Sequence, residues 1–419
     1  MEEKFVHSVT LDKDLCRGCT NCVKRCPTEA IRVRDGKATI TKERCIDCGE
    51  CIRVCPHHAK IAVVDPIESI RGFKHVIALP APTLYGQFKK AEDINAILTA
   101  LKKIGFDDVF EVALAADAVS AHTALLMDTG QLNRPAISSA CPAVLRIIRV
   151  RFPELIRNLV NIRAPMEVAA IWARKRAMEK TGLNAEDIGC VFITPCPAKA
   201  TSAKAPLVST GHAVNAVVSI AAVYPLLLAA LKGIEQEPLS ASGSVGISWA
   251  TSGGECSGIR RPDHLAADGI ENVISVLEAL EDEKITDVDF IELNACLGGC
   301  VGGVLTVESP FLAKNRIKRL TERHMQAIIE DMPVSKMLWD IALTYEPVMR
   351  LDEDVGTAME KLKKIDELEE RFNGMDCGAC GAPTCRAMAE DIVNAGLDED
   401  MCIYRMREKL QTLLSEAEG

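Results

Sequence analysis

The stretch FIELNACLGGCVGG, residues 290–303, joins a strand-like apolar run to two cysteines in a glycine-rich turn. Cys296 and Cys300 face the same side if the turn curls helically, because residues four apart share a helix face. The four glycines of the turn let the backbone approach a bulky group closely. Thiolates bind soft metals, and loops of this kind often hold iron–sulfur clusters. Taken alone, the stretch is equally consistent with a strand and turn that carry two inert cysteines.

Two other segments also place a cysteine just after a predicted strand. Cys141 follows a short strand in SSACPAV, and Cys196 follows another in TPCPAKA. A single Cys-Pro loop is usually an ordinary turn, but three loops at equivalent positions favour a shared site. In open α/β sheets, sites form beyond the carboxyl ends of the strands. We therefore expect Cys141, Cys196, Cys296 and Cys300 to converge, and four thiolates are enough to hold one 4Fe-4S cluster.

Strand and helix patterns alternate through residues 76–350, which predicts an α/β fold with mainly parallel sheets covered by helices. A helical periodicity covers residues 91–104 and stops at a glycine. The longest apolar run, residues 216–231, is interrupted by Ser219 and Pro225, which favours a buried helix over a membrane span. The predicted strands are 76–82, 136–139, 190–194, 244–248 and 289–293, and residues 108–117 are predicted to run from a strand into a helix.

Composition narrows the class of protein. A chain of 419 residues predicts two or three domains, and its 48% hydrophobic content is enough for sizeable cores. The net charge of −10 argues against a nucleic-acid partner, since neutralising phosphates needs a basic surface. The first residues contain no apolar core segment, so we expect no signal peptide and a cytoplasmic protein. In that reducing setting, the 18 cysteines are expected to bind metal rather than form disulfides.

Residues 1–75 contain the pattern C-x2-C-x2-C-x3-C-P twice. This spacing is typical of bacterial two-cluster ferredoxins, in which the fourth cysteine of each run ligates the other cluster. Two zinc knuckles are the alternative, but the Cys-Pro endings and the triplet spacing fit clusters better. The pattern therefore predicts one-electron transfer through a short relay. The expected ligand sets are Cys16, Cys19, Cys22 and Cys55 for one 4Fe-4S cluster, and Cys45, Cys48, Cys51 and Cys26 for the second.

Residues 351–419 form a third predicted unit, which is helical. Apolar residues recur there at helical spacing among lysines and glutamates, which is typical of a packing or dimer face. These residues are Met359, Leu362, Ile365, Leu368 and Phe372. The cysteines that follow resemble the single 4Fe-4S domain with the motif CGxCGxxxCxxxA, although four cysteines would also satisfy zinc. They are Cys377, Cys380, Cys385 and Cys402.

The three cysteine loops between residues 76 and 350 resemble the signature loops of the FeFe-hydrogenase catalytic domain, which read roughly TSCCPAW, MPCxxKK and ExMACxGGCxxGGG. The resemblance implies an α/β catalytic domain that holds the H-cluster, a 4Fe-4S part joined to a di-iron part with CO and CN ligands. It implies that Cys300 bridges the two parts, that Lys199 contacts a cyanide, and that Glu292 is the glutamate of the third loop. The implied cofactor ligands are Cys141, Cys196, Cys296 and Cys300. Residues 161–170 and 249–258 also resemble family stretches.

Four positions depart from the family pattern. Ala140 stands where the family has its proton-relay cysteine, and an alanine cannot carry a proton. Thr194 and Asn294 replace two methionines, and Ala200 replaces a second lysine. These changes make the site more polar and remove the usual proton donor. They resemble divergent hydrogenases with a proposed sensory role, which implies slow turnover.

A proton route without that cysteine needs other groups within hydrogen-bond reach of one another or of a water. Glu292 and Glu255 are the first candidates, because each lies beside a predicted cofactor loop. Cys256 and Ser257 could complete a short chain. For Glu255 the alternative is a loop carboxylate that faces solvent or caps a helix. Cys190, between apolar neighbours, is expected to be a core thiol.

The function predicted is interconversion of H2 with protons and electrons, with electron relay through a ferredoxin-like α+β domain (1–75) and a C-terminal 4Fe-4S domain (351–419). The expected partners are a redox protein such as a ferredoxin, or a signalling protein, together with the di-iron maturation enzymes and a second copy in a homodimer. One alternative is a hydrogen sensor with slow turnover. The other is a non-catalytic iron–sulfur protein that never receives the di-iron unit.

Overall fold

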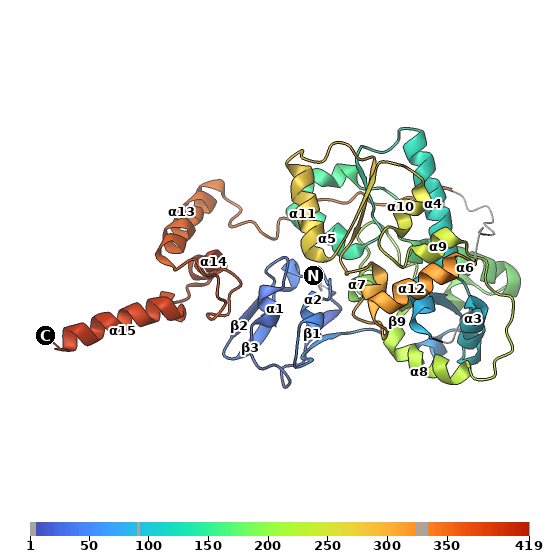
Figure 1. Cartoon of the computed structure of the whole chain (residues 1–419), viewed down its shortest axis with the longest axis horizontal. Coiled ribbons are helices and arrows are strands. Elements are labelled where there is room, and N and C mark those ends of the chain that lie inside the picture. Colours follow the sequence, from blue (N-terminus) through green and yellow to red (C-terminus); the bar gives the residue numbers. More distant parts are fainter. Residues whose placement is uncertain (1–5, 90–92, 324–326, 328–333, 419) are drawn as a thin grey trace. The chain divides into compact units, whose positions relative to one another are not determined.

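The computed structural model describes residues 6–89, 93–323, 327 and 334–418. The chain divides into two compact units (Figure 1). The first unit contains Met1–Cys45, Glu50–Ile61 and Glu346–Gly419, so it joins the two ends of the sequence. The second unit contains Ile46–Gly49 and Ala62–Tyr345. Among the described residues, no helix is long and apolar enough to cross a membrane.

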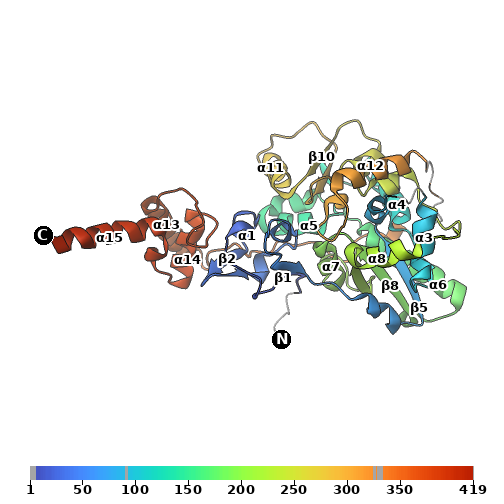
Figure 2. The same cartoon turned by 60° about the horizontal axis from the view of Figure 1, so that its bottom comes forward.

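The larger sheet of the second unit has four parallel strands in the order β6-β5-β8-β9. They are β5 (His75–Pro80), β6 (Asp108–Val109), β8 (Ile188–Thr194) and β9 (Ala216–Ser219). Every residue of β8 is buried, which is typical of a parallel strand covered on both faces. Figure 2 shows β5 and β8 side by side, as their pairing requires.

Alternate residues of these strands belong to two different cores, because neighbouring side chains of a strand point to opposite faces. Cys190 and Phe192 pack with α4 (Val112–Asp128) and α6 (Pro165–Thr181) on one face. Val191 and Ile193 pack on the other face with α3 (Ile94–Lys103), α8 (Ile220–Ala230) and α12 (Pro310–Thr321). The predicted core position of Cys190 therefore agrees with the structure, in which that side chain is fully buried.

A second parallel sheet has the order β10-β11-β7. Its strands are β7 (Ala136–Ile137), β10 (His264–Asp268) and β11 (Phe290–Asn294). Ile291 and Leu293 of β11 pack with α5 (Pro142–Arg151) and α11 (Ile270–Glu281) in a third core. The short helices of this unit are α7 (Pro197–Lys204), α9 (Ser244–Ser248) and α10 (Gly254–Ile259). The predicted mixed α/β fold with parallel sheets is confirmed.

Two element predictions are wrong. The expected strand 244–248 is helix α9, because the Asp117 carboxylate of α4 accepts hydrogen bonds from the amides of Gly243 and Gly246, each at 2.8 Å. The expected buried helix 216–231 is instead strand β9 followed by α8. Ser219 separates the two, since its hydroxyl accepts a hydrogen bond from the amide of Ala222 at 3.1 Å and caps α8.

The first unit contains two small sheets and five α-helices in its described residues. One sheet pairs β1 (Val9–Leu11) with β4 (Lys60–Ala62), and the other pairs β2 (Ile31–Arg34) antiparallel with β3 (Lys37–Ile40). The helices are α1 (Asn21–Lys24), α2 (Glu50–Arg53), α13 (Val355–Arg371), α14 (Cys385–Ala395) and α15 (Ile403–Glu418). The apolar stripe of α13 is divided: Ile365, Leu368 and Phe372 pack against α14, whereas Met359 and Leu362 are exposed.

Candidate functional site

The three cysteine loops of the second unit all follow the carboxyl ends of parallel strands. Cys141 and Cys196 each occupy the N-cap position of a helix, α5 and α7, with a proline at the first helical residue. Cys296 and Cys300 lie in the turn after β11, where Gly298 and Gly299 adopt positive φ angles of 81° and 89°. A side chain is rarely tolerated at such angles, so the glycines are required for this turn.

These loops meet at one cavity. Cys141, Cys300 and Lys199 line it, as do the carboxyl-bearing side chains of Glu255 and Glu292. The remaining residues of its lining include Ser138, Ala140, Met166, Trp249 and Asn294. The structure therefore brings together loops that are separated by more than 50 residues in the sequence, as the topological argument predicts.

The positive charge of Lys199 interacts with all four cysteines of these loops. Its Nζ lies 3.7 Å from the Sγ of Cys300. Burial lowers the pKa of Lys199, but the negative charges of Cys300, Cys196, Cys141 and Cys296 outweigh burial and raise it above its usual value. Four thiols with one ammonium beside them form a donor set that fits an anionic iron–sulfur cofactor.

Two buried carboxyl groups form the polar wall of the cavity. Glu292, in β11, is 3% exposed and accepts hydrogen bonds from the amides of Gly253 and Cys256, both at 3.0 Å, and from the side-chain amide of Asn294 at 2.8 Å. Glu255, at the start of α10, is 5% exposed and accepts a hydrogen bond from the Ser138 hydroxyl at 2.5 Å. The alternative of a solvent-facing loop carboxylate is therefore wrong for Glu255.

Burial and mutual repulsion set the protonation of this pair. Burial, together with the negative charge of Glu292, raises the pKa of Glu255 to about 8 against the opposing effect of the Ser138 hydroxyl. Burial also raises the pKa of Glu292, although its amide donors act in the opposite direction. Two like charges this deeply buried are not both ionised at neutral pH, so the pair retains a proton. The pKa of the Cys256 thiol is raised by burial and by both carboxylates.

The other predicted positions have different surroundings. Ala140 lines the cavity, and its amide donates to the Ser138 hydroxyl at 3.3 Å. Thr194 is fully buried and shares hydrogen bonds of 3.1 Å with the backbone of Cys196, so it braces the ligand loop. Ser257 is exposed and donates to the carbonyl of Gly253. Ser138 was not among the predicted residues, although a serine before SACP was a visible polar signal.

The cysteines of the first unit have the contacts expected of cluster loops. All 18 cysteines of the chain lie in the described residues, and none of them is in a disulfide. Backbone amides donate to three of the predicted ligand sulfurs, those of Cys16, Cys26 and Cys55, at 3.4, 3.2 and 3.3 Å. The C-terminal motif also converges, because its four cysteines line a single cavity. The C-terminal arrangement supplies a set of four thiols of the kind that a 4Fe-4S cluster uses.

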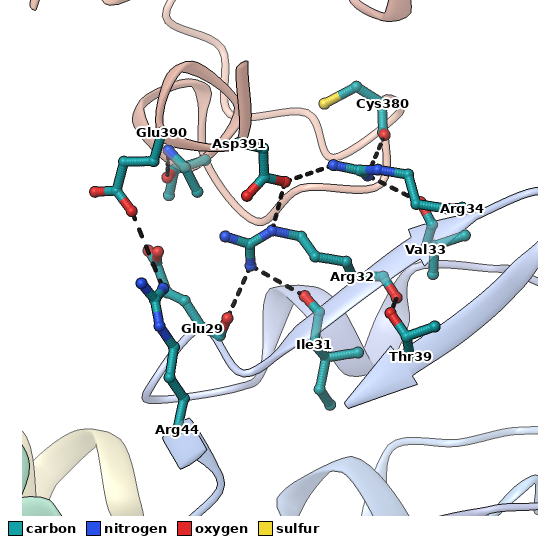
Figure 3. A network of polar contacts seen from close by, with 12 residues as sticks. Glu29, Ile31, Arg32, Val33, Arg34, Thr39, Arg44, Cys380, Glu390 and Asp391 are labelled. Carbon is teal, nitrogen blue, oxygen red and sulfur yellow. Dashed lines mark hydrogen bonds and ion pairs between the residues drawn. The ribbon is translucent and has the colours of Figure 1, made fainter. Parts of the chain in front are cut away.

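The C-terminal motif binds strand β2 within the first unit (Figure 3). Arg32 and Arg34 both donate to the same oxygen of Asp391, at 2.8 and 2.5 Å. Arg34 also donates to the carbonyl of Cys380 at 2.8 Å, and the amide of Val33 donates to the carbonyl of Gly381 at 2.9 Å. These contacts attach the C-terminal cysteine motif to the module that carries the two N-terminal repeats.

Residues 74–261 and 254–304 match the family model of the iron-only hydrogenase large subunit, C-terminal domain, which covers more than half of the chain. The chain belongs to this family. Residues 8–56 match a 4Fe-4S dicluster domain, and residues 373–404 match a model of an Fe-S cluster. Iron–sulfur domains therefore flank the hydrogenase-family domain on both sides in the sequence.

Two curated relatives and one solved structure show how far the similarity extends. The chain is 24% identical to iron hydrogenase 1 of Clostridium pasteurianum over 284 residues, which are 55% of this chain and 50% of that protein. It is 30% identical to the large subunit of the periplasmic Fe hydrogenase of Nitratidesulfovibrio vulgaris over 213 residues, 46% of this chain and 51% of that one. The chain thus spans about half the length of these relatives.

The structural match concerns an FeFe-hydrogenase studied for oxygen inactivation through modification and degradation of the H cluster 2Fe subcluster. It has a TM-score of 0.50 at 15% identity, and the match covers 66% of this chain and 95% of that chain. This likeness shows that the iron-only hydrogenase family member described here has the fold of those enzymes.

Proposed function

We propose that this family member interconverts H2 with protons and electrons at the cavity between the cysteine loops. The observation that supports this most directly is Lys199, whose ammonium lies 3.7 Å from the sulfur of Cys300 and interacts electrostatically with all four cysteines. Cys141, Cys196, Cys296 and Cys300 would hold the 4Fe-4S part of an H-cluster, and Cys300 would bridge it to the di-iron part. When bound, that di-iron part supplies a Lewis-acidic iron with an open position for H2.

We propose further that the carboxyl pair carries the proton. Ala140 lines the cavity where a relay thiol would stand and cannot exchange a proton. Glu255 faces the same cavity and has a pKa of about 8, so it holds a proton at neutral pH and can release it. The Ser138 hydroxyl orients Glu255, and Asn294 with two backbone amides orients Glu292. The buried thiol of Cys256 also interacts with the Glu292 carboxyl group and would extend the polar chain.

Electrons would travel through further 4Fe-4S clusters, two in the N-terminal repeats and one in the C-terminal motif. The hydrogen bonds of Arg32 and Arg34 to Asp391 hold that motif against β2, which supports electron exchange between the two cluster sites (Figure 3). A ferredoxin-type protein or a signalling protein would then accept or supply electrons, and dedicated maturation enzymes would insert the di-iron part. A homodimer stays a prediction.

A sensory role with slow turnover is part of the same proposal, because the cavity lacks the relay thiol. The rival hypothesis, a non-catalytic iron–sulfur protein, accounts less well for Lys199. Burial of an ammonium is costly, and a plain 4Fe-4S cluster held by four cysteines does not require one.

Infrared spectroscopy tests the proposal. Protein purified after coexpression with di-iron maturation enzymes should show CO and CN⁻ stretching bands, and protein made without those enzymes should lack them. The absence of these bands after maturation would refute the hydrogenase proposal. If the bands are present, Glu255→Ala should reduce H2 turnover at least tenfold, whereas Glu281→Ala, the same change at an exposed glutamate of α11, should leave turnover unchanged. Unchanged turnover in Glu255→Ala would remove that residue from the proton route.

A further inference from the structure

One structurally equivalent position of the two N-terminal repeats holds an apolar residue in the first repeat and a charged residue in the second. Ile31 and Lys60 each stand five residues after the last cysteine of their run, Cys26 and Cys55, and each is the first residue of a strand. In both copies, the amide four residues after that cysteine donates to its sulfur, at 3.2 and 3.3 Å. In both copies, the residue three after the cysteine has a positive φ, 51° and 50°. The backbone is therefore the same, and only the side chain has changed from isoleucine to lysine.

Lys60 is as deeply buried as its apolar counterpart. Both Lys60 and Ile31 are 2% exposed, so the lysine does not extend its charged end to solvent. Within the described part of the chain, the Nζ atom of Lys60 has no hydrogen-bond partner. A buried charge is ordinarily paired, because removing it from water costs several kcal/mol. The protein itself supplies no such partner, so the position calls for an anionic group.

The buried core beside Lys60 contains cysteines of both expected ligand sets. Ala59, the residue before Lys60, packs in one core with Cys22 and Cys51, and the partly buried Cys55 packs against the same core. Cys22 and Cys55 are expected to ligate one cluster, and Cys51 is expected to ligate the other. Lys60 therefore lies close enough to act on both cluster positions.

We propose that Lys60 is a positioning charge shared by the two clusters of the N-terminal module, with its buried ammonium raising the reduction potential of both. This proposal rests on the proposed cluster ligation. Reduction of a cluster adds one electron and no proton, and the nearby positive charge stabilises the added negative charge in a low-dielectric interior. With Lys60 in place of a second isoleucine, the module accepts electrons more readily than an apolar module would.

Redox titration monitored by electron paramagnetic resonance tests the proposal on the full chain. Protein made without di-iron maturation enzymes is used, and the paired clusters are recognised by the magnetic interaction between neighbouring reduced centres. Lys60→Met should lower the reduction equilibrium constant of the pair at least tenfold, which equals 59 mV for a one-electron couple. Lys60→Arg keeps the charge and should stay near the wild-type value. Lys13→Met is the matched control, because Lys13 is an exposed lysine of the same module.

Wild-type potentials in Lys60→Met, with iron content and paired signals intact, would overturn the proposal. If Lys60→Met fails to assemble its clusters, Lys60→Gln carries the test, since it keeps a polar side chain and removes the charge. Unchanged potentials in that variant would also overturn the proposal. A wild-type protein without paired cluster signals after cluster reconstitution would reject the cluster ligation itself, which distinguishes failure of the proposed function from failure of the role of Lys60.

Discussion

Replacing Glu255 by glutamine should remove a proton that the folded protein holds at neutral pH. Glutamine keeps the shape of the side chain and cannot titrate. The pKa of Glu255 is raised from 4.5 to about 8, mainly by burial. The folded protein therefore binds this proton more tightly than the unfolded chain does. The resulting stabilisation is complete below pH 4.5 and is lost as the pH rises to about 8.

The size of the effect follows from that window. Each unit of pKa shift corresponds to about 1.4 kcal/mol, so the full window is worth up to roughly 5 kcal/mol. Removal of Glu255 should flatten the decrease in stability between these pH values. It should also lower the pKa of Glu292, because a like-charged neighbour disappears.

Infrared difference spectra provide the assay, since a protonated buried carboxyl has a C=O stretch that its ionised form lacks. Subtracting the Glu255→Gln spectrum from the wild-type spectrum at a series of pH values isolates this band. We expect it to persist at pH 7 and to disappear with a midpoint near 8. Glu281→Gln, at an exposed carboxyl of α11, is the control for the substitution itself. A midpoint for Glu255 near the ordinary value of 4.5 would refute the reasoning.

Three other changes test the framework around the sites. Asp391→Asn should weaken the attachment of the C-terminal motif to β2 by about 1–2 kcal/mol, because two partly buried arginines lose a charged acceptor, and faster limited proteolysis of residues 372–418 would report it. Gly381→Ala should detach the motif more completely in the same assay, since its Cβ would lie 1.9 Å from the carbonyl oxygen of Val33 at a φ of 82°. Glu111→Gln should lower the thermal midpoint and cost about 1–3 kcal/mol, because this buried carboxylate accepts hydrogen bonds from backbone amides and hydroxyls that an amide nitrogen cannot accept.

The cavity between the cysteine loops could be predicted because its determinants are local and repeated. Each loop follows a buried apolar strand, and the carboxyl ends of parallel strands lie at one edge of a sheet. That rule alone predicts that Cys141, Cys196 and Cys300 lie close together. The role of Lys199, three residues after Cys196, is implied by the family resemblance, and the structure places both residues at the start of α7.

The errors arose where distant residues decide the local structure. Residues 244–248 alternate like a strand. Asp117, more than 120 residues earlier in the sequence, accepts hydrogen bonds from the amide just before this segment and from one amide within it, and these bonds favour a helix. The contacts of Asp391 with Arg32 and Arg34 join residues more than 350 positions apart. No periodicity or spacing within either segment encodes these partners. Ordinary charged side chains acquire such roles only when folding brings them together.

The proposed use of a carboxyl group in place of a relay thiol depends on the folded site. An ordinary glutamate, with a pKa of 4.5, would have lost its proton at neutral pH and could not replace a thiol whose usual pKa is 9.0. Burial beside Glu292 brings Glu255 to about 8, within about one unit of that thiol. A carboxyl group tuned in this way can hold and release a proton over the same pH range. The alanine at position 140 would therefore slow proton transfer by changing its geometry, while the driving force for transfer would remain similar.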